Sequence, residues 1–158
     1  MPGLSPGTPG AKEAYGISIL RENLSIQIPP KAFRRYNLAD NESVLLTSTR
    51  HDERGFAVMN LEKAKLSVFK KVIDKIDGID QVYRINSRPF LITKVKNSKI
   101  YFDKDIVEGF DLEIGERYLI IKSTTMAMSY TPVDIWKRKF EKEGFLESIK
   151  NIDSLEIF

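Results

Sequence analysis

Apolar and polar residues alternate in two short stretches near the beginning of the chain. Ile17 and Ile19 alternate with small or polar residues. After a polar turn, the alternation resumes with Leu24, Ile26 and Ile28. Because successive side chains of a strand point to opposite faces of the sheet, a period of two is typical of half-buried strands. The pattern therefore predicts two short strands joined by a tight turn.

A short helix and a third strand are expected next. Pro29 and Pro30 end the second strand, because proline has no amide hydrogen for the ladder, and Pro30 suits the first turn of a helix. After a turn rich in Asn and Asp, the apolar residues 44–46 predict another strand. Between these points, three apolar residues have the spacing of one helix face: Ala32, Phe33 and Tyr36.

Residues 97–121 repeat the pattern of residues 23–47 without a gap, at the offset of 74 that separates residue 97 from residue 23. Gly115 takes the turn position of Asn41, and both residue types tolerate a left-handed backbone. A repeat at a fixed period indicates two copies of one structural unit. Apolar positions of the first copy fall on apolar positions of the second: Ile26 on Ile100, Ile28 on Phe102, Ala32 on Ile106, Phe33 on Val107, Tyr36 on Phe110 and Leu38 on Leu112.

Each copy is followed by a looser repeat, which starts with a hairpin. We expect the first hairpin over residues 47–59 and a shorter one over residues 121–130. Arg50, His51 and Arg54 lie in the loop of the first hairpin. Loops of this kind often carry function, but neighbouring carboxylates neutralise these cations, so an ordinary surface loop is the stronger interpretation.

A longer helix is expected after each hairpin. Asn60 can cap the first, and Gly78 is a suitable end, since apolar residues recur between them every four positions. Pro132 is expected at the first position of the second helix. Residues 152–158 are apolar enough to dock on the body of the protein or on another subunit. Three aromatic residues are expected to pack in the core rather than to form a docking ridge: Trp136, Phe140 and Phe145.

Composition narrows the range of functions. The chain has 158 residues, 42% of them hydrophobic, with no apolar run long enough to span a membrane and no signal-peptide pattern, so we expect a cytoplasmic protein without membrane partners. It has no cysteine and one histidine, His51, which argues against thiol catalysis, a metal site or a serine-type triad. We therefore expect no enzyme activity, no cofactor and no metal.

The repeated unit resembles a known family. Residues 23–38 have the alternating strand, the Ile-Pro step and the short helix of the swapped-hairpin core of the AbrB/SpoVT family, and residues 112–117 resemble its L-x-x-G-D/E ending. Tandem copies, each followed by a helix, are similar to the arrangement in MraZ proteins, as is the sequence Val-Asp-Ile-Trp at 133–136. The resemblance covers roughly residues 15–143.

The resemblance implies an α+β fold in which two swapped-hairpin halves of one chain form an intramolecular, pseudo-dimeric, β-barrel-like core with flanking helices. On this interpretation residues 1–14 form a flexible tail, residues 15–80 the first half, residues 81–145 the second half and residues 146–158 a further tail. The family consists of DNA-binding transcriptional regulators. The expected partner is therefore double-stranded DNA, and a homo-oligomer or a protein partner stays open.

The candidate DNA-binding residues are basic residues of the strand turns and of the first short helix. In the alignment of the copies Lys96 matches Glu22 and Lys99 matches Ser25. Ordinary solvated charges on strand edges are an equally strong interpretation of this set. The seven candidates are Arg21, Lys31, Arg34, Arg35, Lys94, Lys96 and Lys99.

The two copies differ in surface charge, so any DNA contact is expected to be asymmetric. The second short helix is surrounded by carboxylates, Asp103, Asp105, Glu108 and Asp111, which repel phosphate. Two alternatives to DNA binding therefore stay open. One is a non-catalytic interaction scaffold on the same fold, and the more distant one is a small cradle-loop enzyme or substrate-recognition domain.

Overall fold

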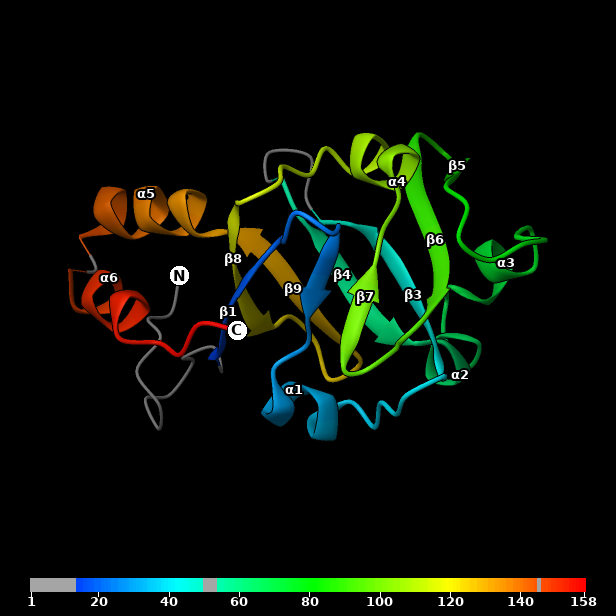
Figure 1. The fold of residues 1–158 in the computed structure, drawn as a ribbon, viewed down its shortest axis with the longest axis horizontal. Helices are drawn as coiled ribbons and strands as arrows, with labels where there is room; N and C mark the ends of the chain where they lie inside the picture. Colours follow the sequence, from blue (N-terminus) through cyan, green and yellow to red (C-terminus); the bar gives the residue numbers. More distant parts are fainter. Residues whose placement is uncertain (1–13, 50–53, 145) are drawn as a thin grey trace.

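The computed structural model describes residues 14–49, 54–144 and 146–158, and it has an α+β fold. Some residues of the predictions above lie outside this description: Arg50 and His51 of the first loop, Phe145, and residues 1–13 of the predicted tail. Seven antiparallel strands form the main sheet (Figure 1). In spatial order they are β1 (Ala14–Ile19), β8 (Arg117–Lys122), β9 (Ala127–Pro132), β4 (Phe56–Asn60), β3 (Ser43–Ser48), β6 (Arg88–Lys94) and β5 (Tyr83–Ile85).

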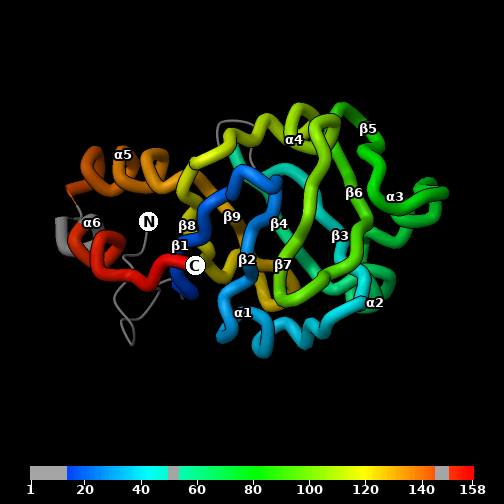
Figure 2. The backbone as a smooth tube through the Cα atoms, viewed as in Figure 1, coloured from blue at the N-terminus to red at the C-terminus, as the bar shows by residue number. Residues whose placement is uncertain are grey.

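A second sheet of two short strands, β2 (Ser25–Gln27) and β7 (Lys99–Tyr101), lies across one face of the main sheet (Figure 2). The strands are antiparallel, and Ile26 stands opposite Ile100. Both side chains are buried in one cluster with Leu46, Phe56 and Tyr118 of the main sheet. The largest core of the protein therefore fills the space between the two sheets.

Six helices are described, and most of them cover the other face of the main sheet. Leu45, whose neighbours in β3 face the small sheet, packs instead with residues of α2 and α3. Leu119 of β8 packs in the same way with Trp136 and Phe140 of α5. Both faces of the sheet are thus buried. The helices are α1 (Pro30–Arg35), α2 (Leu61–Ala64), α3 (Lys70–Ile73), α4 (Lys104–Gly109), α5 (Val133–Glu143) and α6 (Leu146–Asp153).

The strand pairing joins the first half of the chain to the second. β1 and β3 precede residue 81, whereas β6 and β8 follow it, yet β1 pairs with β8 and β6 pairs with β3. β2 and β7, which the repeat aligns with each other, are also partners. Each half therefore obtains its strand neighbours partly from the other half.

Backbone hydrogen bonds between the small sheet and the strand turns recur at the offset of the repeat. The Ile28 amide donates to the Ser98 carbonyl at 2.8 Å. At positions 74 residues away from these, the Phe102 amide donates to the Leu24 carbonyl at 2.8 Å. The match in sequence between the two copies is therefore also a match in backbone contacts.

A second pair of equivalent bonds shows where the offset changes. The Asn41 amide donates to the Val95 carbonyl at 2.7 Å, and the Gly115 amide donates to the Leu20 carbonyl at 2.8 Å. Asn41 and Gly115 are 74 residues apart and both have a positive φ, as the sequence predicts for this turn. Leu20 and Val95 are 75 residues apart, so between this position and the turn at Asn41 or Gly115 the first copy has one residue more than the second.

The strand turn requires a correction to the predicted match of Lys96 with Glu22. The Arg21 amide donates to the Ser25 carbonyl at 2.9 Å, and the Lys96 amide donates to the Lys99 carbonyl at 2.9 Å. Lys96 therefore occupies the position of Arg21, not that of Glu22. The turn of the first copy spans one residue more than that of the second, and an ungapped alignment could not show this difference.

The main sheet is open, so the expected barrel-like core is not a closed barrel. The strand order runs from β1 at one edge to β5 at the other, and the ladders found among the described residues do not join these edges. Within the same part of the chain, no helix has both the length and the apolar character needed to cross a bilayer.

The single helix predicted between Asn60 and Gly78 is wrong. Asn60 does cap a helix, accepting hydrogen bonds from the amides of Glu62 and Lys63, but α2 ends at Ala64. The Ser67 hydroxyl donates to the Ala64 carbonyl at 2.6 Å and accepts from the Phe69 amide at 3.1 Å. This side chain competes with the helical backbone bonds and separates α2 from α3.

The second longer helix agrees better with the sequence. Trp136 and Phe140 are buried against the main sheet, as predicted, whereas Pro132 is the residue before the first helical one. Gly144 ends α5 with a φ of 79°. The apolar residues near the end of the chain dock on the protein itself, because Ile152 is fully buried and Ile157 forms a bridge with Ile17.

The contact of Ile26 with Ile100 can be tested by truncation. Ile100 is fully buried at the centre of the small sheet, so Ile100→Ala should lower the free energy of unfolding by about 2–5 kcal/mol in a denaturant titration. Leu66→Ala is the control, because this side chain is 91% exposed and its loss should change stability by at most about 0.5 kcal/mol. Similar small losses in both variants would contradict the proposed position of the core.

Candidate functional site

The basic turn of the second copy lies beside the basic short helix of the first copy. The Ile28 amide, just before α1, donates to the Ser98 carbonyl, and the Asn41 amide, just after α1, donates to the Val95 carbonyl. The Ser98 amide also donates to Asp40 Oδ1 at 3.0 Å. The turn between β6 and β7 is therefore held on both sides of α1 by backbone contacts.

Helix α1 presents its cations to solvent because its apolar residues face the core. Ala32 and Tyr36 are buried, whereas Lys31, Arg34 and Arg35 are exposed. Pro30 provides a fixed φ at the first helical position. The Tyr36 side chain reaches the main sheet, where its hydroxyl donates to the Ala127 carbonyl of β9 at 3.1 Å. The helix is thus fixed on the main sheet with its basic side outward.

The candidate lysines of the second half border two hollows on either side of β7. Lys94 and Lys96 are exposed and line one of about 490 Å3 together with Tyr101. Lys99, which is half-buried, lines another of about 530 Å3 with Arg21. These lysines therefore extend the row of basic side chains from α1 along the small sheet, although Asp80, Asp103 and Glu22 line the same two hollows.

The seventh candidate, Arg21, lies on the opposite side of the small sheet from α1. Its turn contacts the second copy through the Leu24 carbonyl, which accepts from the Phe102 amide, next to α4. Its guanidinium donates to the main-chain oxygen of Phe158 at 3.0 Å. The structure thus brings six of the seven predicted residues to the α1 side and the adjoining strand, and Arg21 joins them only through the hollow that it shares with Lys99.

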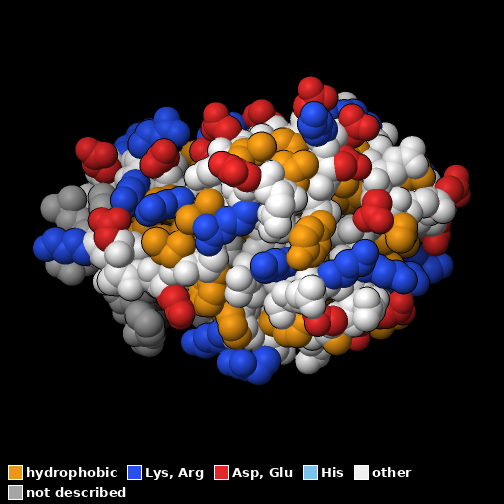
Figure 3. Space-filling view, viewed as in Figure 1, with side chains coloured by type: hydrophobic (Ala, Val, Ile, Leu, Met, Phe, Trp, Pro, Cys, Tyr) orange, Lys and Arg blue, Asp and Glu red, His pale blue; other side chains and the backbone are white. Residues whose placement is uncertain are grey.

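Carboxylates surround α4 at the opposite end of this face. Asp103 caps the helix by accepting a hydrogen bond from the Ile106 amide at 2.8 Å, while Asp105, Glu108 and Asp111 are exposed. The space-filling view shows acidic side chains gathered over α4 and basic ones over α1, with a band of basic side chains between them (Figure 3). The charge asymmetry of the two copies becomes an asymmetry between two ends of one face.

Two residues on the outer face of the small sheet were missed in the sequence. Gln27 and Tyr101 alternate with the buried positions Ile26 and Ile100, so their side chains lie on the outer face. Tyr101 is 37% exposed and borders the same hollow as Lys94. The signal was present, since the period-two pattern that buries the isoleucines also exposes their neighbours.

Arg54, considered as a loop residue that could reach a partner, is instead paired with carboxylates of the second copy, although its side chain remains 41% exposed. Its guanidinium makes two contacts with the Glu116 carboxylate, at 2.9 and 3.0 Å, and lies 3.8 Å from Glu113. The hydrogen bond to Glu116 raises the pKa of Arg54, with a smaller opposing effect of burial. This ion pair joins the first hairpin to the last turn of the second copy and has a structural role.

The tyrosine hydroxyls of the core are buried, and this changes their acidity. Burial raises the pKa of Tyr118 and that of Tyr130 above the ordinary range. The Tyr130 hydroxyl donates to the Gln27 carbonyl at 3.0 Å, which links the main sheet to the small sheet. These phenols therefore serve as neutral hydrogen-bonding groups.

The described part of the chain holds no group of three or more His, Asp or Glu residues arranged to bind a metal ion. Comparisons with protein-family models, with curated proteins and with solved structures find no match for this chain. The candidate interface therefore depends on the residues and contacts given above.

The buried tyrosines predict a loss of stability in alkali. Because their pKa values are raised in the folded state, the favourable contribution is fully present below the ordinary tyrosine pKa of about 10 and is lost as the pH rises above it. In an alkaline titration, part of the phenolate absorbance should appear only when the circular dichroism shows unfolding. The chain unfolded in urea is the control, and its phenolate absorbance should rise in a single earlier step. A native chain that titrates completely while still folded would contradict the burial of these hydroxyls.

Proposed function

We propose that the protein is a DNA-binding transcriptional regulator of the AbrB/MraZ type, built as a swapped-hairpin pseudo-dimer within one chain. The fold part of this proposal is supported by the exchange of strand partners between the halves and by the equivalent hydrogen bonds of the two copies. Each half contributes one strand to the small sheet, and Ile26 and Ile100 meet where a two-fold axis would pass.

The observation that carries the functional proposal is the position of the turn between β6 and β7 beside α1. This turn is hydrogen bonded to residues before and after α1. The positive charge of Lys96 from the second copy therefore adds to that of Arg34 and Arg35 from the first. Cations that are grouped on one surface can contact successive phosphates of a duplex. The strand exchange thus produces a larger basic surface than either copy has by itself.

The outer face of the small sheet has the properties of a surface that enters a groove. The major groove of DNA admits a two-stranded β-ribbon, and Gln27 and Lys99 stand opposite each other on β2 and β7. Amide and ammonium groups can donate to base edges, while the arginines of α1 contact phosphates. The acidic surface over α4 would remain outside the contact, because it repels phosphate.

A non-catalytic interaction scaffold on the same fold is the second candidate. Leu66 is 91% exposed and Val68 is 87% exposed, in the segment that separates α2 from α3. Exposed aliphatic side chains close together are typical of protein contact surfaces. The acidic helix α4 fits this alternative as well, because it opposes binding to nucleic acid at one end of the molecule.

A salt titration with duplex DNA tests the proposal. Binding to a labelled duplex of mixed sequence should weaken steeply with salt, with a logarithmic slope of about −0.9 for each phosphate contacted. The double variant Arg34→Ala, Arg35→Ala should bind more weakly and reduce the steepness of that slope by up to about 1.8. Fluorescence anisotropy across a series of salt concentrations measures both quantities.

The matched control is Lys71→Ala, Lys75→Ala, which removes two exposed cations from the α3 region, away from α1. It has the same net charge as the arginine variant, so a difference between the two assigns the effect to the position of the charges. Equal losses of affinity in both variants would show that the interaction is only a non-specific attraction between DNA and the positive charge of the protein. If the native chain shows no binding even at low salt, DNA binding is excluded and the scaffold function remains.

A further inference from the structure

Residues 154–158, here called the strap, follow α6 and lie along the outer edge of β1. The Ile17 amide donates to the Glu156 carbonyl at 2.9 Å, and the Phe158 amide donates to the Ile17 carbonyl at 2.7 Å. Ile157 stands beside Ile17 in a parallel bridge. The strap therefore occupies the edge of the main sheet in the manner of an added strand.

The edge of β1 is shaped to receive the strap. Gly16 has a φ of +137°, which side-chain-bearing residues rarely adopt, and it lies at an irregularity in the pairing of β1 with β8. A Cβ atom at this position would be 2.7 Å from Cε2 of the Phe158 ring. A side chain at position 16 would therefore force the Phe158 ring to move away from β1.

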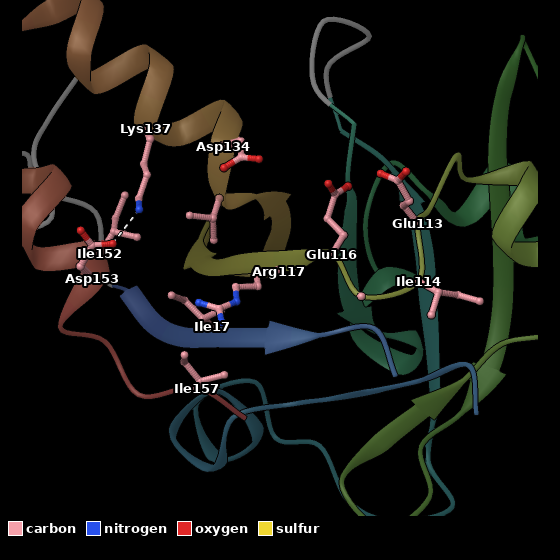
Figure 4. A pocket seen from close by; sticks show the side chains of 12 residues that line it. Ile17, Glu113, Ile114, Glu116, Arg117, Asp134, Lys137, Ile152, Asp153 and Ile157 are labelled. Carbon is pink, nitrogen blue, oxygen red and sulfur yellow. Dashed lines mark hydrogen bonds and ion pairs between the residues drawn. The ribbon is translucent and has the colours of Figure 1, made fainter. Parts of the chain in front are cut away.

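Helix α6 holds the beginning of the strap in place. Lys137 of α5 pairs with Asp153 at 2.6 Å, and Ile152 is fully buried against α5 and β8. Figure 4 shows this pair at one side of a hollow of about 480 Å3, with Ile17 and Ile157 next to each other at its base. The strap is therefore anchored at its beginning, while its far end rests on β1.

The far end of the strap reaches Arg21, one of the predicted DNA-binding residues. The Arg21 guanidinium donates to the main-chain oxygen of Phe158 at 3.0 Å. We infer that the strap competes with DNA phosphate for Arg21 and thereby lowers the affinity of the protein for DNA. This inference rests on the proposed function, and it adds a means by which the same surface is regulated.

Two further features indicate that the strap can be displaced. It is joined to β1 by three main-chain hydrogen bonds, one of them 3.4 Å long, whereas β3 and β4 share five paired positions, and Ile157 remains 46% exposed. Segments with few buried contacts open at a much lower free energy than the core. The strap also carries Glu156, an exposed carboxylate whose charge opposes a nearby phosphate. Bound DNA and the docked strap should therefore exclude each other.

Release of the strap is tested with Phe158→Ala, which removes the ring from Gly16. Phe158→Pro is a stronger variant, because it also removes the amide that donates to Ile17. Faster hydrogen exchange of the Ile17 amide, with thermal unfolding nearly unchanged, reports that the strap has been released. Both variants should bind the labelled duplex roughly fivefold more tightly than the native chain, with a salt slope steeper by about 0.9.

The effect should depend on Arg21. In an Arg21→Ala background, Phe158→Ala should leave both the affinity and the slope unchanged, because the cation for which strap and phosphate compete is missing. Leu66→Ala, which truncates an exposed side chain far from β1, is the control for loss of apolar surface. If hydrogen exchange at the Ile17 amide shows that the strap is released in the Phe158 variants, but these variants bind DNA with the affinity of the native chain, the inference alone is overturned. Absence of DNA binding in every variant, including those with a released strap, would overturn the proposed function and the inference with it.

Discussion

The antiparallel contact of β2 with β7 is the constraint on which the rest of the fold depends. These strands are short, and two strands alone are at best marginally stable in water. They persist because Ile26 and Ile100 are buried in the core that the main sheet completes from the other side. Since one strand comes from each half, the halves can complete this core only together. The close hydrogen-bond equivalence of the two copies follows from that requirement.

The pairing of strands between the two halves also determines where surface charge accumulates. A turn that belongs to the second copy in sequence lies beside the helix of the first, and the turn of the first lies near the helix of the second. Positive charge therefore gathers around α1, although the net charge of the chain is only +3. The carboxylates of α4 have the opposite effect at the other end. The spatial arrangement, rather than the composition, produces the polarity of this face.

Local patterns predicted the elements well, because alternation and helical spacing are properties of neighbouring residues. The strands around Ile26 and Ile100, the short helices, the turn at Asn41 and Gly115 and the burial of Trp136 all follow from such patterns. The break at Ser67 did not, because a hydroxyl that bonds to the backbone can end a helix whose apolar spacing continues. The separation of Arg21 from α1 and the ion pair of Arg54 with Glu116 depend on contacts between distant segments, which spacing along the chain does not encode.

The two equivalent outer strands, β1 and β6, are covered by unrelated segments. β6 is covered by β5 in an antiparallel ladder, whereas β1 is covered by the strap in a parallel bridge. Unpaired strand edges invite other chains to add to a sheet, and proteins commonly cover them. Here each cover has its own sequence and its own strength. A change that loosens the strap would therefore expose the edge of β1 and leave the cover of β6 in place, so a foreign strand would be added to the sheet beside β1.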